Sequence, residues 1–406
     1  MTDNSFSRRD FLKFSGVLAG AVLLPACAHN MRKMEAELAA MPVDDAWTPH
    51  VASAWIPKEE HPNAYGVFKK TIEASTDFSW LSNGDSVFIK LSLNSSNPFP
   101  ATSDPWALAF LIRLLQEKGA GKIMVGDSSG MESVHWTRDS QKGSSRECCI
   151  KAGLMDAILQ NGAEPVFFEE AGYDAFIPLY PVEPHHWHEP LWISSAVNEA
   201  DHIIYMARVS SHIMGDITSG MKIGVGFLRE DSRKAFHRGG DDFYAMYEEI
   251  NHVPEIASKL RLSVSSGRKV LATFGPDNGH VTAPSSGLVI ASEDLVAHEL
   301  LSYAWLLYNR EHETGFFDMG VTGRLTRMRS PINRGFVWYT WRDGGFFQTP
   351  KIPMFIAGNI YAHPSIVNAM NRKGGRPDRI DWEQVNPSAE TEMMADYIRN
   401  KIAAES

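Results

Sequence analysis

From residue 86 onward, short apolar segments alternate with longer stretches of helical length. Residues 87–91 and 122–126 have the composition of buried strands, and residues 105–118 between them have that of a helix. Strands separated by helices pair in parallel through right-handed crossovers. The sequence therefore predicts an α/β fold with a mostly parallel sheet flanked by helices. Further strands are expected at 165–168, 202–207, 269–274 and 287–291, and further helices at 145–161, 191–199, 217–228, 241–260 and 295–309.

The alternation defines a predicted core at residues 81–310, which we expect to form two lobes meeting near residue 210. Residues 28–80 show no core pattern and are predicted to be a tether and an N-terminal wrap. Residues 311–406 are expected to form a small β-rich appendage and a terminal helix, because the aromatic run from Phe336 to Trp341 fits short strands.

The N-terminus has the organisation of a targeting segment. Arg8 and Arg9 are followed by Phe11-Leu12-Lys13 and then by an apolar stretch of about eleven residues, which is well short of the roughly 20 that span a bilayer. The arginine pair and the residues after it resemble the bacterial twin-arginine consensus. That resemblance implies export by the Tat translocase, a route that carries folded proteins.

Leu24-Pro25-Ala26-Cys27 resembles a lipobox and closes a predicted signal peptide at residues 1–27. In that case Cys27 is lipidated and becomes the first residue of a periplasmic protein tethered to the membrane. The alternative is ordinary cleavage near Ala26 or Ala28, which would release a soluble product.

The net charge of −10 argues against nucleic acid as a partner, because phosphates call for clustered Lys and Arg. Besides Cys27, the chain has only the adjacent pair Cys148-Cys149, so we expect no iron–sulfur cluster, which needs four ligands. The pair is interpreted as two small apolar helix residues, with a redox role as the alternative.

Ligands of open parallel sheets bind where strands end, so polar residues at those positions are candidates for a site. Lys90 lies within an apolar strand, where a buried ammonium needs an anionic partner unless it reaches the surface. Asn94 lies in the loop that follows. Asp127, in Gly126–Gly130, also follows a strand directly and suits a metal or a hydroxylated ligand, although an Asx turn would explain it as well.

Two further loops carry candidate residues. His212 follows the strand at 202–207, and Lys222 and His237 lie beyond it. Asp277 and His280 follow the strand at 269–274 in a Gly-rich turn. Histidine can bind a metal or move a proton, and lysine can hold an anion, but helix capping and turn formation are equally compatible with these spacings.

Several segments together resemble the family called domain of unknown function 362. The likeness covers roughly residues 85–300. The family carries no settled reaction, and this chain has Ala207–His212 where members commonly have Pro-Lys-Leu-Lys-Thr-His, so two lysines of a potential anion site are absent. The matching segments are residues 87–90 with Asn94, 100–105, 125–128, 201–205, His212, 221–222, Arg233, His237 and 291–297.

These observations predict an exported protein with an inter-lobe pocket for a divalent metal or a small anionic ligand, and they favour an enzyme. The alternative is a non-catalytic periplasmic solute-binding, metal-binding or assembly protein, and a structural envelope protein is the third reading. The expected roles are catalysis for Asp127, His212 and His237; ligand binding for Lys90, Asn94, Lys222 and Asp277; and metal binding for Asp127, His212 and His280.

Overall fold

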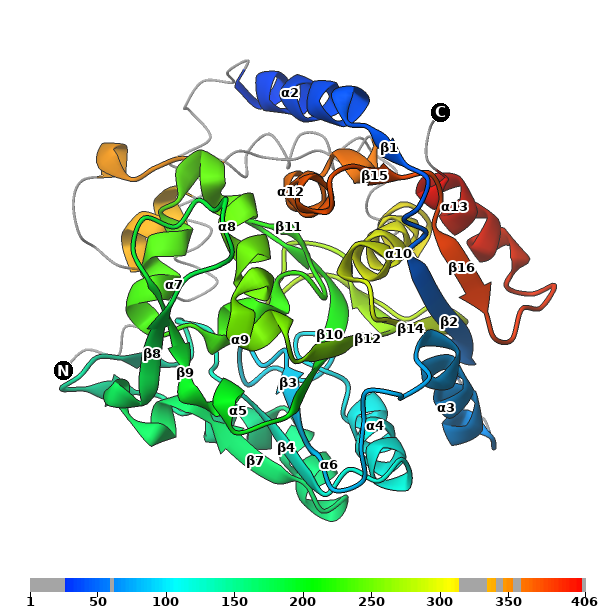
Figure 1. Cartoon of the computed structure of the whole chain (residues 1–406), viewed down its shortest axis with the longest axis horizontal. Coiled ribbons are helices and arrows are strands. Elements are labelled where there is room, and N and C mark those ends of the chain that lie inside the picture. The colour runs from blue at the N-terminus through cyan, green and yellow to red at the C-terminus, as the bar shows by residue number, and fades with distance from the viewer. Residues whose placement is uncertain (1–25, 59–61, 314–333, 341–345, 353–358, 404–406) are drawn as a thin grey trace.

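A ten-stranded sheet runs through the molecule in the computed structural model (Figure 1). The structure describes residues 26–58, 62–313, 334–340, 346–352 and 359–403. The edge-to-edge strand order is β16 (Asp381–Gln384), β2 (His50–Pro57), β14 (Ser286–Ser292), β12 (Leu260–Leu271), β10 (His202–His212), β3 (Ser86–Leu91), β4 (Lys122–Asp127) and β7 (Glu164–Phe167). The short strands β11 (Asp216–Thr218) and β13 (Val281–Thr282) pair with β10 and β12.

Five neighbouring strands of this sheet, β12, β10, β3, β4 and β7, are parallel. In their register Tyr205 lies opposite Lys90, and Lys90 lies opposite Gly126. The loops that leave β3, β4, β10 and β12 therefore share one edge of the sheet, which is where parallel sheets place their ligands. On the other side of β12, β14 is antiparallel to both β12 and β2, and β16 is parallel to β2.

Helices cover both faces of the sheet, and the strand pleat explains why. In β10, Ile203, Tyr205 and Ala207 pack into one core and Ile204 and Met206 into the other. Among the described residues, no helix is long and apolar enough to cross a membrane. The first face carries α2 (Ala26–Ala40), α8 (Phe243–Glu249), α10 (Leu295–Tyr308), α12 (Pro364–Lys373) and α13 (Glu392–Ile402), and the second carries α3 (Ala64–Ser75), α4 (Pro105–Glu117), α5 (Ser145–Lys151) and α6 (Leu154–Gln160) (Figure 1).

Smaller elements complete the described part of the chain. Three short strand pairs lie outside the main sheet, and two short helices follow the 3-10 helix η4 (Ile223–Phe227). The pairs are β1 (Val43–Asp44) with β15 (Arg376–Pro377), β5 (His135–Trp136) with β6 (Gln141–Lys142), and β8 (Phe176–Leu179) with β9 (Leu191–Ser194); the helices are α7 (Glu230–His237) and α9 (Pro254–Ala257).

The predicted fold class, a mostly parallel sheet flanked by helices, is confirmed. The strands expected at 87–91, 122–126, 165–168 and 287–291 and the helices expected at 105–118 and 295–309 are all present within a residue or two. Local chemistry explains the sharp start of α4, because the Asp104 side chain accepts the backbone N–H of Trp106 and Pro105 occupies the first helical turn.

Four expected helices differ from the prediction. Residues 191–199 form β9 and a 3-10 turn, since Leu191 and Ile193 alternate into the core as a strand requires. Residues 217–228 contain β11 and η4 instead of an α-helix, and residues 241–260 split into α8, a 3-10 turn and α9. The helix at 145–161 is interrupted at Gly153, whose φ of 78° lies in the left-handed region that favours glycine. The strand expected at 269–274 is the end of the longer β12.

The flanks also differ. β2 lies inside the sheet, so residues 28–80 provide a core strand; its run of alanine and serine gave little sign of burial. β10 passes straight through residue 210, where two lobes had been expected to meet. Residues 334–340 are helical rather than strands, and β16 extends the main sheet, so the described C-terminal residues are no β-rich appendage. The twin-arginine segment lies outside the described residues. Within 311–364, so do residues 314–333, 341–345 and 353–358.

We predict that Asn386→Ala lowers the free energy of unfolding by about 1–3 kcal/mol, the cost of leaving a buried polar group unpaired. The Asn386 side chain accepts the N–H of Trp55 and donates to its carbonyl, both at 2.8 Å, and so ties the C-terminal segment to β2. Urea unfolding monitors the change, with exposed Asn371→Ala as the control. Equal stability of the two variants would contradict an integral C-terminal strand.

Candidate functional site

A buried ion pair lies at the shared carboxyl edge of β3 and β4. Lys90 Nζ is 2.6 Å from Asp127 Oδ1 and donates a second hydrogen bond to the carbonyl of Leu91 at 2.8 Å. Asp127 also accepts the backbone N–H groups of Leu93 at 2.9 Å and Ser128 at 2.7 Å. Each charge is thus met by several partners, which is the condition under which a buried pair is tolerated.

The 3-10 helix η4 covers this pair. A Cβ on Gly226 would lie 2.0 Å from Asp127 Oδ1 and 2.2 Å from Lys90 Nζ, so only glycine allows the backbone to approach so closely. The Phe227 ring centroid lies 5.4 Å from Lys90 Nζ. Burial lowers the pKa of Lys90 to about 8, and the Asp127 carboxylate opposes this shift.

Arg233 of α7 binds the backbone around the same ion pair. Its guanidinium donates to four backbone carbonyls, those of Ser128, Ser129, Gly226 and Leu228. The loop after β4 and the helix η4 are thereby bound to one side chain. All of the charge of Arg233 is taken up by the protein itself, so it is a scaffold residue of the site.

Arg208, near the end of β10, is wholly buried and only partly satisfied. Its Nη1 donates to the carbonyls of Pro100, Ala101 and Pro276, while Nε and Nη2 are buried without a partner among the residues that the structure describes. Nε and Nη2 together form the edge of a guanidinium that binds a carboxylate with two parallel hydrogen bonds. Three other arginines of this chain use that same edge in this way: Arg146 with Glu170, Arg229 with Asp231, and Arg268 with Asp104.

Asp277, in the loop after β12, lies near Arg208. Burial raises its pKa above the ordinary range, while Arg208, a hydrogen bond from Ser95 and Lys222 oppose the rise. Its Oδ1 is buried without a partner. Glu132 is exposed as a residue, but burial of its carboxyl and the neighbouring Asp277 raise its pKa to about 7. In both carboxyl groups the raised pKa favours the protonated form more than in an exposed side chain.

The backbone before Lys222 is held on both sides. Glu299 of α10 is fully buried, and its Oε2 accepts the N–H of Met221 at 3.0 Å. The Asn251 side chain donates to the carbonyl of Met221 at 2.8 Å. Gly220 is equally confined, because a Cβ there would lie 2.7 Å from a ring nitrogen of His298. Lys222 therefore leaves a fixed peptide rather than a free loop.

The Lys222 side chain runs through apolar surroundings. Its Cδ and Cε lie 3.5 Å from the place where a Cβ of Gly215 would be, and its Nζ lies 5.5 Å from the Phe236 ring centroid. Burial, followed by the positive charges of Arg208 and Arg233, lowers the pKa of Lys222 to about 7. An appreciable fraction of this side chain is thus a neutral amine near neutral pH.

The structure brings Lys90, Asp127, Lys222 and Asp277 to one edge of the sheet, but it gives the histidines other surroundings. His212 Nδ1 accepts the N–H groups of Met214 and Gly215, both at 3.1 Å. His237 donates from Nδ1 to the Arg233 carbonyl, and burial followed by the charge of Lys222 lowers its pKa to about 3.

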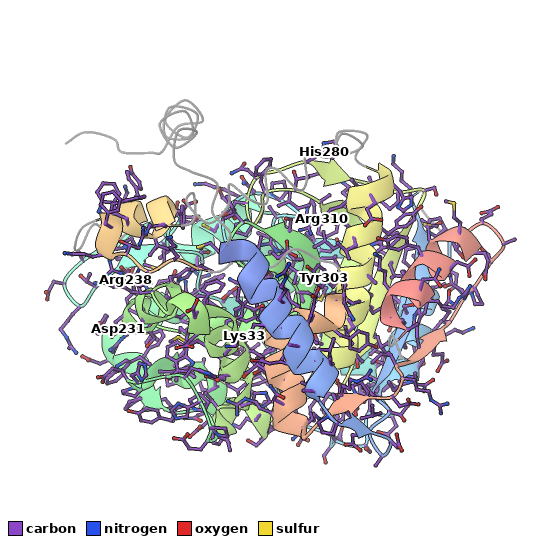
Figure 2. The ribbon with its side chains drawn as sticks, turned by 90° about the horizontal axis from the view of Figure 1, so that it is seen from above. Lys33, Asp231, Arg238, His280, Tyr303 and Arg310 are labelled. Carbon is purple, nitrogen blue, oxygen red and sulfur yellow. The ribbon has the colours of Figure 1, made fainter. Side chains whose placement is uncertain are left out.

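The remaining predicted residues lie at the margin. His280 is exposed at the rim of the molecule, whereas Arg310 and Tyr303 lie further inside (Figure 2). Asn94 is half-buried, and its carbonyl accepts the N–H of Gly130. In the described part of the chain, no three His, Cys, Asp or Glu side chains gather closely enough to hold a metal. The metal set Asp127, His212 and His280 is therefore not assembled.

Sequence reasoning missed Arg208 and Glu299 as site residues. Arg208 carried the same signal as Lys90, a charge within an apolar strand, and could have been found by it. Glu299 lies in a helix whose buried face gave no such contrast. Cys148 and Cys149 are free and buried in α5, and burial raises both thiol pKa values, that of Cys149 to about 12, so both side chains are protonated at neutral pH.

The fold is that of an α/β protein with charged side chains buried at the carboxyl edge of its parallel strands. The chain belongs to the family described as domain of unknown function (DUF362), whose model matches residues 87–304, more than half of its length. A twin-arginine translocation signal matches at residues 5–25.

No curated protein matches the chain. Among solved structures, the lactate racemase apoprotein from Thermoanaerobacterium thermosaccharolyticum is 12% identical, with a TM-score of 0.39 over 62% of this chain and 56% of that one. A protein from Thermotoga maritima is 14% identical, with a TM-score of 0.32 over 52% of each chain. The chain thus spans little more than half the length of these structures, and neither likeness bears on its ligand or activity.

We predict that Lys90→Met lowers the free energy of unfolding by roughly 3–5 kcal/mol at pH 7, the range for breaking a buried pair. The physical reason is that Asp127 would stay buried without its cation. Urea unfolding measures the effect, and Lys142→Met, at an exposed position, is the control. A loss as small as that of the control would show that the pair does not hold the edge together.

Proposed function

We propose that this exported protein binds a small anion, a carboxylate or a phosphate, at the edge of the sheet where Arg208 and Lys222 lie. The observation that carries the proposal is the Nε and Nη2 edge of Arg208, which is buried and has no partner. Leaving two charged donors unpaired in the interior would cost several kcal/mol, so a ligand with two coplanar oxygens is the natural complement.

The charge balance around the site supports an anion. Lys90 is paired with Asp127, and Arg233 is bound to backbone carbonyls. What remains is the positive charge of Arg208 and Lys222; Asp277 acts on both, and burial raises the pKa of Asp277. A bound anion would supply the missing negative charge. No metal enters this proposal.

We favour an enzyme, because groups able to exchange protons lie beside the proposed anion. The pKa of Lys222 is lowered to about 7, so this side chain can change protonation state near neutral pH, and burial raises the pKa of the neighbouring Asp277. The roles differ from those expected for Asp127 and His237, since Asp127 is held by Lys90 and two N–H groups and His237 stays neutral. Capture of a solute without turnover is the alternative.

Proton exchange separates the two functions. An enzyme that moves protons at the bound anion would exchange carbon-bound hydrogens of a suitable carboxylate with deuterated solvent, which proton NMR follows directly. A capture protein would bind the same compound and leave its C–H signals unchanged.

Export by the twin-arginine route is supported by the matched signal. We further propose that Cys27 is lipidated and holds the folded domain at the periplasmic face of a membrane. The support is the lipobox-like sequence from Leu24 to Cys27. The helix α2 begins at Ala26, and from Met34 on its apolar residues pack against the first core, so the anchor would sit close to the domain.

We predict that anion affinity falls as the pH rises through about 7. The anion binds the charged form of Lys222, and deprotonation removes one charge-assisted hydrogen bond, which corresponds to a loss of roughly 10–100-fold between pH 6 and pH 9. Phosphate, oxalate, succinate and citrate serve as probes, first by thermal shift and then by calorimetry with the one that stabilises most.

Two variants test the same prediction. Lys222→Met should lower affinity and abolish its pH dependence, and Arg208→Gln should abolish binding. Because Arg208 is buried, each variant is first checked by circular dichroism and unfolding. Exposed Lys269→Met is the matched control. If neither substitution in a folded variant changes the affinity for any probe, the proposed anion site does not exist.

We predict that Cys27→Ala moves the protein from the membrane fraction to the soluble exported fraction and removes labelling by a clickable fatty acid. Replacing Arg8 and Arg9 with lysines should instead keep the protein inside the cytoplasm. Cell fractionation with an antibody distinguishes the three locations. Membrane association that survives Cys27→Ala would contradict the lipid anchor while leaving the export signal untouched.

A further inference from the structure

Two lysines, Lys90 and Lys222, are buried at the carboxyl edge of the sheet, and their ammonium groups have different partners. Lys90 has a carboxylate at 2.6 Å and a carbonyl at 2.8 Å. For Lys222, the described part of the chain offers no carboxylate or carbonyl within hydrogen-bond distance of Nζ. The Phe236 ring centroid lies 5.5 Å from this atom. The protein therefore stabilises the Lys90 ammonium through direct contacts, whereas Lys222 has only the nearby charge of Asp277 and no direct hydrogen-bond partner among the described residues.

The surroundings of Lys222 favour the neutral amine. Its stem lies against Gly215 and Phe236, and two cationic side chains, Arg208 and Arg233, act on it. A desolvated lysine beside other cations is the arrangement that turns an amine into a nucleophile at neutral pH.

Arg208 supplies the second element, a recognition group for one end of a ligand. Its free Nε and Nη2 edge matches a carboxylate. A ligand with a carboxylate at that edge and a carbonyl carbon beside Lys222 would meet both unsatisfied groups at once. The chemical class that combines these two features is an oxo acid.

We propose that Lys222 condenses with the carbonyl group of a small oxo acid whose carboxylate is held by Arg208. The proposal rests on the proposed anion site and names the substrate class and the reaction that this site would serve.

The condensation balances as follows. The Nζ lone pair forms a bond to the carbonyl carbon, and the carbonyl electron pair moves to oxygen, which takes a proton from Asp277. Nζ returns one proton to the Asp277 carboxylate. The hydroxyl group then takes that proton and leaves as water while the nitrogen lone pair forms the C=N bond, which gives a protonated imine and the Asp277 carboxylate. Transfer of the remaining N–H proton to that carboxylate gives the neutral imine, so amine and ketone give imine and water, with no oxidant or reductant required.

Borohydride trapping tests the proposal. The exported protein is incubated with pyruvate, 2-oxoglutarate or acetoacetate, reduced with sodium borohydride, digested and mapped by mass spectrometry. We expect a reduced adduct at Lys222, formed at least tenfold faster than at exposed Lys269 or at buried, paired Lys90. Lys222→Arg keeps the charge but removes the nucleophile, so its adduct should vanish while succinate still binds.

The outcomes are distinguishable. Adducts spread over exposed lysines, with no change in Lys222→Arg, would overturn the condensation. Binding of succinate and oxo acids with equal affinity and no adduct would also overturn it, but would leave the anion site standing. If the wild-type protein binds neither class of acid, both the condensation and the anion site fail.

Discussion

A buried ion pair joins the carboxyl ends of β3 and β4. Its ammonium and carboxylate are 2.6 Å apart, and both are shielded from water. Lys90 belongs to β3 and Asp127 to β4, and Asp127 also receives the N–H groups that begin both following loops. The helix η4 can lie on the pair only because residue 226 is glycine. Arg233 then binds the carbonyls of the same loop and of η4, so η4, which begins directly after Lys222, is held against the buried pair.

Because that corner satisfies its own charges so fully, the groups that remain unsatisfied are informative. Buried polar atoms are nearly always paired, and a charged donor pays the largest cost when it is not. The Nε and Nη2 edge of Arg208 has no hydrogen-bond partner among the described residues, whereas Lys90 and Arg233 are met by carboxylate or carbonyl oxygens. The contrast holds for the cationic side chains alone, because Ser128 Oγ and Glu299 Oε1 are also buried without a partner in that part of the chain.

The sequence was sufficient for the fold class because the alternation of apolar and helical segments recurs over more than 200 residues. It failed for β2, where Ala52-Ser53-Ala54 interrupts the apolar residues Val51, Trp55 and Ile56, and for η4, where glycines stop a helix. Lys90 could be recognised from one strand, but its pairing with Asp127 depends on the register of β3 and β4. The histidines were overvalued because their partners are backbone groups, which a sequence does not display.

The route of export bears on how such a site can exist at all. The charged residues of the site are Lys90, Asp127, Arg208, Lys222, Arg233 and Asp277. They meet only when β3, β4, β10 and β12 are already paired. The contacts of Asp127 with Lys90 and Leu93 and of Arg233 with Ser128 join residues 34 to 105 positions apart, so the unfolded chain does not bring them together. The twin-arginine signal directs the protein to a translocase for folded chains. The buried pair, the covering glycine and the unsatisfied Arg208 edge would therefore be in place before the protein crosses the membrane, and any tightly held ligand could be acquired on the cytoplasmic side.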